Sequence, residues 1–501
     1  MPRLVYLLAP CAFLSGCFAP GDGLEVPQDE IYFPVGLAVD RSASRLFVVS
    51  SDFDLQYNGG AIQSYDLAEL SLQLADKDDS QAACPTGEQA PSAQLLYPGR
   101  CLPMELTPVD QVKIGAFATD LVLRSRPQLD LDGDGGNDIP AGPPERLLVP
   151  VRGDTTLHWL DVEDGVLECG QAGNDGACDN AHRAGQNAAK ENTRDLNLAA
   201  EPFAIDASQD GRTIVVTNQT SGTASLFVDD WSQQGPFLRF ALASESIPSR
   251  PVGIVNLPRP GAMPLSDELV DVSREPLTPE TFLMTFRNSA QVRLVRFAGD
   301  GESTPEREYL IDNGGVGIDA NSVGSDSRGI AIDPSARELA LARCGDGDGE
   351  EAQACRDQAV LTPIDVYVAN RSPASLLIGR TQPPLEYPYF FQSLPLTTGP
   401  SRVVVGKVRA ANGELEVRVF VVCFDSRRIF VYDPQRRRFE AEILTGRGPH
   451  AVAIDTERAL MYVGHFTDSF VGVFSLDLGS PASYGSMLGM LGTPKAPRSS
   501  K

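Results

Sequence analysis

Hydrophobic positions along the chain occur in short runs with strand character, and these runs recur in one fixed order. Each unit starts with a Pro- or Gly-containing segment and continues with an apolar strand that closes near an Asp. A short turn, a second strand, a polar turn and a third strand follow. The clearest copy is Glu201–Asp229, with the strands EPFAID, RTIVVTN and TASLFVD. The strands are rich in Val, Ile, Leu, Phe and Tyr, and we expect no amphipathic helix of useful length.

Seven copies of this unit can be aligned. The residues that close the first strand are Asp40, Arg124, Asp206, Leu257, Asp333, Gly406 and Asp455. The shortest gaps between them approach the roughly 40–50 residues of a four-stranded propeller blade, and the longer gaps require insertions. A fourth strand follows the third, as in Pro236–Ala243 and Phe439–Thr445. The pattern predicts an all-β fold, a single seven-bladed β-propeller over residues 31–491, with two unrelated β-sandwiches as the alternative.

The segment Thr213–Phe227 resembles the YVTN-type propeller repeat, whose second strand ends in a Val-x-Asn-like step. A propeller ring must be closed between its last and first blades. The missing outer strand could come from Leu24–Phe33 or from Ala482–Leu491, and the sequence leaves both open.

The N-terminus has the pattern of an export signal. Arg3 precedes the apolar stretch Leu4–Leu14, which is shorter than the about 20 residues needed to span a bilayer. The sequence Leu-Ser-Gly before Cys17 resembles a bacterial lipobox, with an ordinary secretory signal as the alternative. The resemblance implies a signal peptide over residues 1–16, lipidation of Cys17 with acyl chains such as palmitate, and a tether over residues 17–30. Phe18 implies sorting to the outer membrane, with its periplasmic or cell-surface face undecided.

The remaining cysteines agree with export. Three close pairs lie in polar, Gly- and Asp-rich stretches, and an oxidising compartment would bridge them as disulfides: Cys84 and Cys101, Cys169 and Cys178, Cys344 and Cys355. Local pairing is the simplest of the possible connectivities, and CxxC metal spacing is missing. Cys423 lies in an apolar run and is predicted to be a buried free thiol.

Composition narrows the range of partners. The chain has 501 residues and a formal net charge of −25, so broad binding to nucleic acid is excluded because that requires a basic face. We expect a monomeric ring that contacts the membrane through its lipid anchor, with residues 492–501 as a flexible tail. An unknown protein or glycan is the expected partner.

The segment Asp130–Asp138 has the pattern D-x-D-x-D-G-x-x-D. Alternating carboxylates on a tightly curled loop supply the oxygen ligands that Ca²⁺ prefers. Candidate ligands are Asp130, Asp132, Asp134, the Gly136 carbonyl and Asp138, and Gly135 permits the turn. The pattern resembles the calcium loops of integrin-type propeller repeats, which implies a structural calcium ion. The alternative is an acidic, solvated loop.

The sequence favours a binding module over an enzyme. It contains no HExxH, no nucleophile elbow and no P-loop. His450 and His465 belong to the last repeat and are candidates for the channel mouth, because they lie at strand ends. We expect a non-catalytic, lipid-anchored cell-envelope binding or scaffold protein. The alternative is a lactonase-like propeller hydrolase with its site at the channel mouth, where residues of distant blades can converge without leaving a motif.

Overall fold

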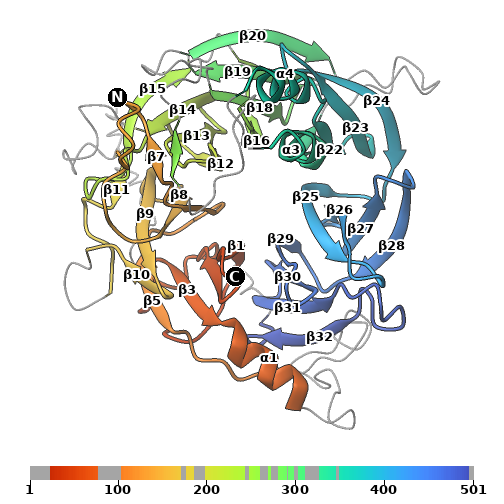
Figure 1. Ribbon diagram of the computed structural model, residues 1–501. Helices are drawn as coiled ribbons and strands as arrows, with labels where there is room; N and C mark the ends of the chain where they lie inside the picture. The colour runs from red at the N-terminus through yellow and green to blue at the C-terminus, as the bar shows by residue number, and fades with distance from the viewer. Residues whose placement is uncertain are drawn as a thin grey trace, which may run out of the picture.

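Seven twisted β-sheets lie side by side around a central channel, as Figure 1 shows in a view along the ring axis. The computed structural model describes residues 23–76, 103–170, 176–185, 198–242, 247–259, 269–271, 280–289, 291–297, 303–310, 326–345 and 349–495. Each sheet is one blade with four antiparallel strands that follow one another outward from the channel in chain order, and two of the blades carry a fifth, short strand. The prediction of a seven-bladed β-propeller is confirmed.

The first three blades contain these strands. Blade 1 has β1 (Pro34–Val39), β2 (Arg45–Ser50), β3 (Gly60–Asp66) and β5 (Asp110–Ile114). Blade 2 has β6 (Val122–Ser125), β8 (Glu145–Val151), β9 (Thr156–Glu163) and β10 (Val166–Glu168), and β11 (Arg183–Ala184) also pairs with β9. Blade 3 has β12 (Pro202–Ala207), β13 (Thr213–Asn218), β14 (Thr223–Val228) and β15 (Phe237–Leu242).

The other four blades complete the ring. Blade 4 has β16 (Pro251–Leu257), β18 (Glu280–Phe286), β19 (Gln291–Phe297) and β20 (Ser303–Leu310). Blade 5 has β21 (Ser327–Asp333), β22 (Asp365–Arg371), β23 (Ala374–Gln382) and β24 (Tyr387–Pro395). Blade 6 has β25 (Pro400–Arg409), β26 (Leu415–Cys423), β27 (Arg428–Asp433) and β28 (Arg438–Leu444). Blade 7 has β29 (Pro449–Asp455), β30 (Leu460–His465), β31 (Phe470–Ser475) and β32 (Met487–Leu491).

A hydrophobic cluster fills each interface between neighbouring blades. The inner strands are therefore buried on both faces, and their sequences are continuous apolar runs. In β2, for example, every side chain from Leu46 to Val49 is fully buried. Sheets that pack on both faces need such runs, whereas a sheet with one solvated face shows alternation.

The ring is closed between blades 7 and 1, which come from opposite ends of the chain. β32 supplies the outer strand of blade 7, so the C-terminal alternative is the one the structure adopts. The segment before β1 instead places the Phe33 amide against the Ser469 hydroxyl of blade 7, at 3.3 Å. A short strand from the blade 1 insertion, β4 (Pro103–Met104), also pairs in parallel with β32. Blades 1 and 7 are thus held together in two ways. They share a hydrophobic core that includes Leu37 and Leu46 of blade 1 and Tyr462 of blade 7, and β4 links the two blades.

The expectation that useful helices are missing is wrong. Within the described residues, three helices interrupt the repeat: α1 (Leu67–Asp76), α3 (Ser335–Ala342) and α4 (Glu350–Ala359). Each lies in an insertion: α1 follows β3, and α3 and α4 separate β21 from β22 (Figure 1). All three are short and bury few side chains: Leu67 and Leu70 in α1, Arg337 and Leu341 in α3, and Ala359 in α4. No helix in the described part of the chain is long and apolar enough to cross a bilayer.

Candidate functional site at the channel mouth

The repeat brings the same two sequence positions of every blade to one end of the channel. Antiparallel pairing sets the start of the first strand against the end of the second, as Pro34 against Ser50 and Pro449 against His465. Residues that follow these two points therefore face the channel mouth. They enclose a cavity of about 370 Å³, here called the mouth cavity, to which all seven blades contribute. This volume lies in the range of small-molecule sites.

Four phenylalanines line one side of the mouth cavity in a continuous contact series. We call Phe117, Phe53, Phe466 and Phe424 the aromatic arc. Ring centroids lie 5.9 Å apart for Phe53 and Phe117, 5.2 Å for Phe53 and Phe466, and 6.3 Å for Phe424 and Phe466. Tilted and edge-on contacts at these distances are the favoured arrangements of aromatic pairs. Phe53 nevertheless keeps 51% of its surface exposed, so the arc offers an open apolar face.

Arginines supply most of the charge of the mouth cavity. Its charged lining residues are Arg152, Arg328, Arg371, Arg402 and Asp120. The Arg402 guanidinium of blade 6 binds the Asp120 carboxylate of blade 2, with 2.8 Å between Nη1 and Oδ1. Blades 7 and 1 separate these two residues around the ring, so this ion pair spans the channel. Because its other guanidinium nitrogen donates to the Thr119 carbonyl at 3.2 Å, Arg402 is fixed at two points.

The other three arginines bind carboxylates that lie outside the cavity lining. Arg152 pairs with Glu201 at 2.6 Å, Arg328 with Asp326 at 2.7 Å, and Arg371 with Asp425 at 2.5 Å. These contacts orient the guanidinium groups without placing a negative charge in the cavity. Burial lowers the pKa of Arg328, and the Asp326 carboxylate counteracts this effect while Arg287 and Arg371 add to it.

The two candidate histidines differ in position. His450 follows Pro449 and lines the mouth cavity. Burial, followed by the positive charge of Arg402, lowers its pKa to about 3, so the imidazole is neutral at physiological pH. His465 is fully buried and stacks on Phe470 with 4.1 Å between centroids, so it does not line the cavity. Side chains alternate along a strand, and the next residue, Phe466, is the one that reaches the mouth.

The predicted calcium loop forms a cluster of carboxylates outside the ring. Oxygens of Asp130, Asp132 and Asp138 lie within 4.8 Å of one another. Asp134 is not part of this group, and its carboxylate accepts the Gly136 amide at 2.6 Å. Gly133 and Gly135 have φ angles of 80° and 87°, which lets the loop curl without strain.

Strand pairing anchors this loop. β7 (Leu129–Asp130) pairs in parallel with β17 (Val270–Asp271), which lies in the insertion of blade 4. Leu129 and Ile139 pack on Trp231 of blade 3 beneath it. The loop thus connects the insertion of blade 2 with the insertion of blade 4, across blade 3. The donor set fits a hard cation, because three carboxylates meet on one small loop.

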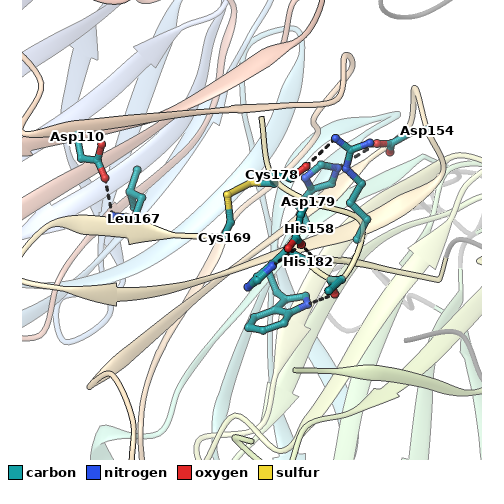
Figure 2. Close-up of a disulfide and its surroundings, with 11 residues drawn as sticks. Asp110, Asp154, His158, Leu167, Cys169, Cys178, Asp179 and His182 are labelled. Carbon is teal, nitrogen blue, oxygen red and sulfur yellow. Dashed lines mark hydrogen bonds and ion pairs between the residues drawn. A yellow bond between two sulfur atoms is a disulfide. The ribbon is translucent and has the colours of Figure 1, made fainter. Parts of the chain in front are cut away.

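The two described disulfides have the predicted local pairing. Cys169–Cys178 and Cys344–Cys355 are both bonded, and Cys423 is buried and free, with its pKa raised to about 11 by burial. Figure 2 shows Cys169–Cys178 beside Asp179 and His182, whose Oδ1 and Nδ1 lie 2.7 Å apart. The bridge therefore fixes an insertion of blade 2 whose His182 ring lies against Trp159, with 4.0 Å between centroids.

Several predicted residues lie outside the described part of the chain. These are Cys17, Cys84 and Cys101.

Sequence reasoning missed the arginines and phenylalanines of the mouth cavity. The signal that could have found them is the repeat itself. Arg152, Phe424 and Phe466 each follow directly on the second strand of their blade, and Arg328 and His450 each follow the first residue of an innermost strand. Aligning the repeats by position, rather than searching for motifs, would have grouped these side chains.

Comparison with known proteins gives no family. No protein-family model matches the sequence, and no curated protein matches it either. Similar solved structures include the periplasmic gluconolactonase PpgL of Pseudomonas aeruginosa, with 14% identity, 83% of this chain and 86% of that chain covered, and a TM-score of 0.45. Others are the hydrazine synthase of Kuenenia stuttgartiensis (11%, 91% and 98%, 0.44) and Sqt1 of Saccharomyces cerevisiae (8%, 94% and 88%, 0.45). At these identities the similarity is no guide to activity.

Proposed function

We propose that the protein is a lipid-anchored cell-envelope β-propeller that binds a small ligand at its channel mouth without transforming it. The observation that carries the proposal is the mouth cavity, which combines about 370 Å³ of space with an apolar wall and four guanidinium groups in its lining. Binding sites are concave, mostly apolar, and carry a few placed polar groups. The surrounding blades are packed on both faces, so the site is held by a rigid frame.

The chemistry of the cavity favours binding over catalysis. A general base works best with a pKa near the operating pH, whereas the pKa of His450 is lowered to about 3. The one carboxylate of the lining, Asp120, is held by Arg402. Both groups are thus poor acceptors for a substrate proton.

A substitution that fills the mouth cavity tests the proposed function. Val404 is a half-buried lining residue, and Val404→Trp would occupy part of the cavity. Native mass spectrometry of protein purified from envelope fractions should show a co-purifying small molecule in the wild type and not in Val404→Trp. Val166→Trp is the matched control, because Val166 is exposed on the outer strand β10. A ligand that stays in Val404→Trp would overturn the site.

The hydrolase alternative rests on His450, whose Nδ1 is buried without a hydrogen-bond partner beside the cavity. If this imidazole took a proton from water or substrate, the wild type would hydrolyse simple lactones and His450→Ala would not. Turnover that disappears in His450→Ala would replace the binding proposal by this one.

The proposal also includes the structural calcium ion. Asp130, Asp132 and Asp138 would hold it, with Asp134 and the Gly136 carbonyl as further ligands. Its effect would be to neutralise the clustered carboxylates and to fasten the insertion of blade 2 to that of blade 4.

The anchor is proposed from the lipobox-like sequence at Cys17. Several acyl chains on one residue give stable membrane attachment without a spanning helix. Cys17→Ser should therefore move the protein from the membrane pellet to the soluble fraction after cell lysis. Continued sedimentation with membranes at high salt would contradict the anchor.

A further inference from the structure

We infer that the ligand of the mouth cavity is a small organic anion that carries an apolar aromatic ring. The inference rests on the proposed function, since it names the chemical class that the same site would take. It is carried by the uneven arrangement of charge and aromatic surface around the cavity.

The charged groups that face the cavity are mostly guanidinium groups, although the whole chain has a formal net charge of −25. Four guanidinium groups and one carboxylate line it, and the partners of three arginines, Glu201, Asp326 and Asp425, lie outside the lining. Guanidinium groups bind carboxylate, sulfonate and phosphate oxygens through paired, charge-assisted hydrogen bonds. An anion is therefore favoured over a cation or a neutral molecule of the same shape.

A separate part of the cavity wall, the aromatic arc, would bind the apolar part of the ligand. The aromatic arc presents an open face at Phe53, which is 51% exposed. A ring laid against it would remove apolar area from water, at roughly 25 cal/mol per Å², and would gain favourable ring contacts.

The two features meet at the ends of the arc. At one end the Arg152 amide donates to the Phe117 carbonyl at 3.1 Å, which places this arginine next to the arc. At the other end Arg371 binds Asp425, the residue that follows Phe424. One molecule with an aromatic ring and an anionic group can thus contact both surfaces.

A matched pair of fluorescent probes tests this class. 1-Anilinonaphthalene-8-sulfonate and N-phenyl-1-naphthylamine share the same rings, and only the first carries a negative charge. We expect the sulfonate to bind the folded protein with one-to-one stoichiometry and at least tenfold more tightly than the neutral amine.

Variants then locate the probe. Arg371→Gln and Phe53→Ala should each weaken sulfonate binding at least tenfold, and Val404→Trp should abolish it. Arg436→Gln is the control, because Arg436 is 57% exposed on blade 6 and does not line the cavity. Circular dichroism of each variant confirms that it is folded.

The outcomes separate the two proposals. Equal affinity for both probes, with loss of binding in Val404→Trp and Phe53→Ala but not in Arg371→Gln, would overturn the anionic class and keep the binding site. Sulfonate binding that no cavity variant changes, or no binding of either probe, would overturn this inference. A ligand that co-purifies with the wild type and is lost in Val404→Trp would still support the proposed function in that case.

Discussion

Glu280 is a buried carboxyl group close to a second one. Arg259 binds the Glu280 carboxylate, and the same guanidinium lies 3.9 Å from Asp210. Burial, followed by the negative charge of Asp210, raises the pKa of Glu280 to about 7. The folded protein therefore holds this proton more tightly than the unfolded chain. The corresponding stability is fully present below the ordinary pKa of Glu and is lost as the pH rises through about 7.

We expect Glu280→Gln to remove this pH dependence. Between pH 5 and pH 8 the wild type should lose up to about 3 kcal/mol of stability relative to the variant, because each pKa unit corresponds to about 1.4 kcal/mol. Urea unfolding at both pH values measures the difference. Glu69→Gln, on the exposed first turn of α1, should follow the wild-type profile. Identical slopes for Glu280→Gln and the wild type would contradict the prediction.

Arg146 is a charged residue at the centre of the contact between blades 2 and 3. It is 1% exposed, and its guanidinium binds both oxygens of Asp229 at 2.8 and 2.9 Å and Asp161 at 2.8 Å. It also lies over the rings of Trp159 and Trp231. Removing one partner of such a buried pair leaves an uncompensated charge.

Arg146→Met should therefore destabilise the protein by about 3–5 kcal/mol. Adding Asp229→Leu should restore at least half of that loss, since the second change removes the buried carboxylate. Arg436→Met, on the surface of blade 6, should cost no more than about 1 kcal/mol. Denaturant midpoints of the four proteins provide the test, and a double variant no more stable than Arg146→Met would count against the explanation.

The loop Asp130–Asp138 is the element whose stability should depend on a ligand. Without a cation its three clustered carboxylates repel one another, and an ion that binds only the folded loop stabilises it by mass action. EGTA should lower the melting temperature of the wild type, and calcium at about 100 times its dissociation constant should raise stability by about 2.7 kcal/mol. Asp132→Ala should abolish the response.

Two further variants sharpen this test. Asp357→Ala, on the exposed face of α4, should keep the full calcium response. Asp134→Ala asks whether the fourth carboxylate joins the site, because it lies outside the group of three. No calcium-dependent shift in the wild type would rule out the calcium site.

At the level of elements, strands were predictable and helices were not. The innermost strands coincide with the aligned repeats, as Pro202–Ala207 and Pro449–Asp455 show. Packing on both faces makes each strand a continuous apolar run that is visible in the sequence. The helix Glu350–Ala359 buries only Ala359, so its sequence carries almost no hydrophobic periodicity. The disulfide Cys344–Cys355, which holds this helix to the segment before it, was predictable because cysteines close in sequence can pair locally.

Closure of the ring is a property of the whole molecule. β4 and α1 of blade 1 lie against β32 of blade 7, and a Cβ added at Gly489 would approach the Met104 sulfur at 2.9 Å and Leu74 Cδ2 at 3.3 Å. Gly489→Val should therefore push β4 and α1 away from β32 and destabilise the ring by about 1–3 kcal/mol. Thermal unfolding and faster amide exchange in α1 and β4 would show the effect.

The control for this substitution is Gly349→Ala, because nothing lies within 4 Å of a Cβ built there. Gly349 is the N-cap residue of α4, so any effect of this change should be confined to that helix, and the exchange of α1 and β4 should stay unchanged. If Gly489→Val behaved like this control, β4 would not contribute to ring closure.

The sequence by itself determined the number of blades, the innermost strands and the local disulfides, because each depends on neighbours within one repeat or one insertion. The choice of closing strand required the tertiary structure, since two segments of similar apolar character were available and only packing between blades 1 and 7 selects one. The mouth cavity required it too. Arg402 and Asp120 are far apart in sequence and meet only because the ring brings blades 6 and 2 to opposite sides of a narrow channel. A site built from one residue per repeat leaves no local motif, so its charge and its aromatic wall appear only once the ring is closed.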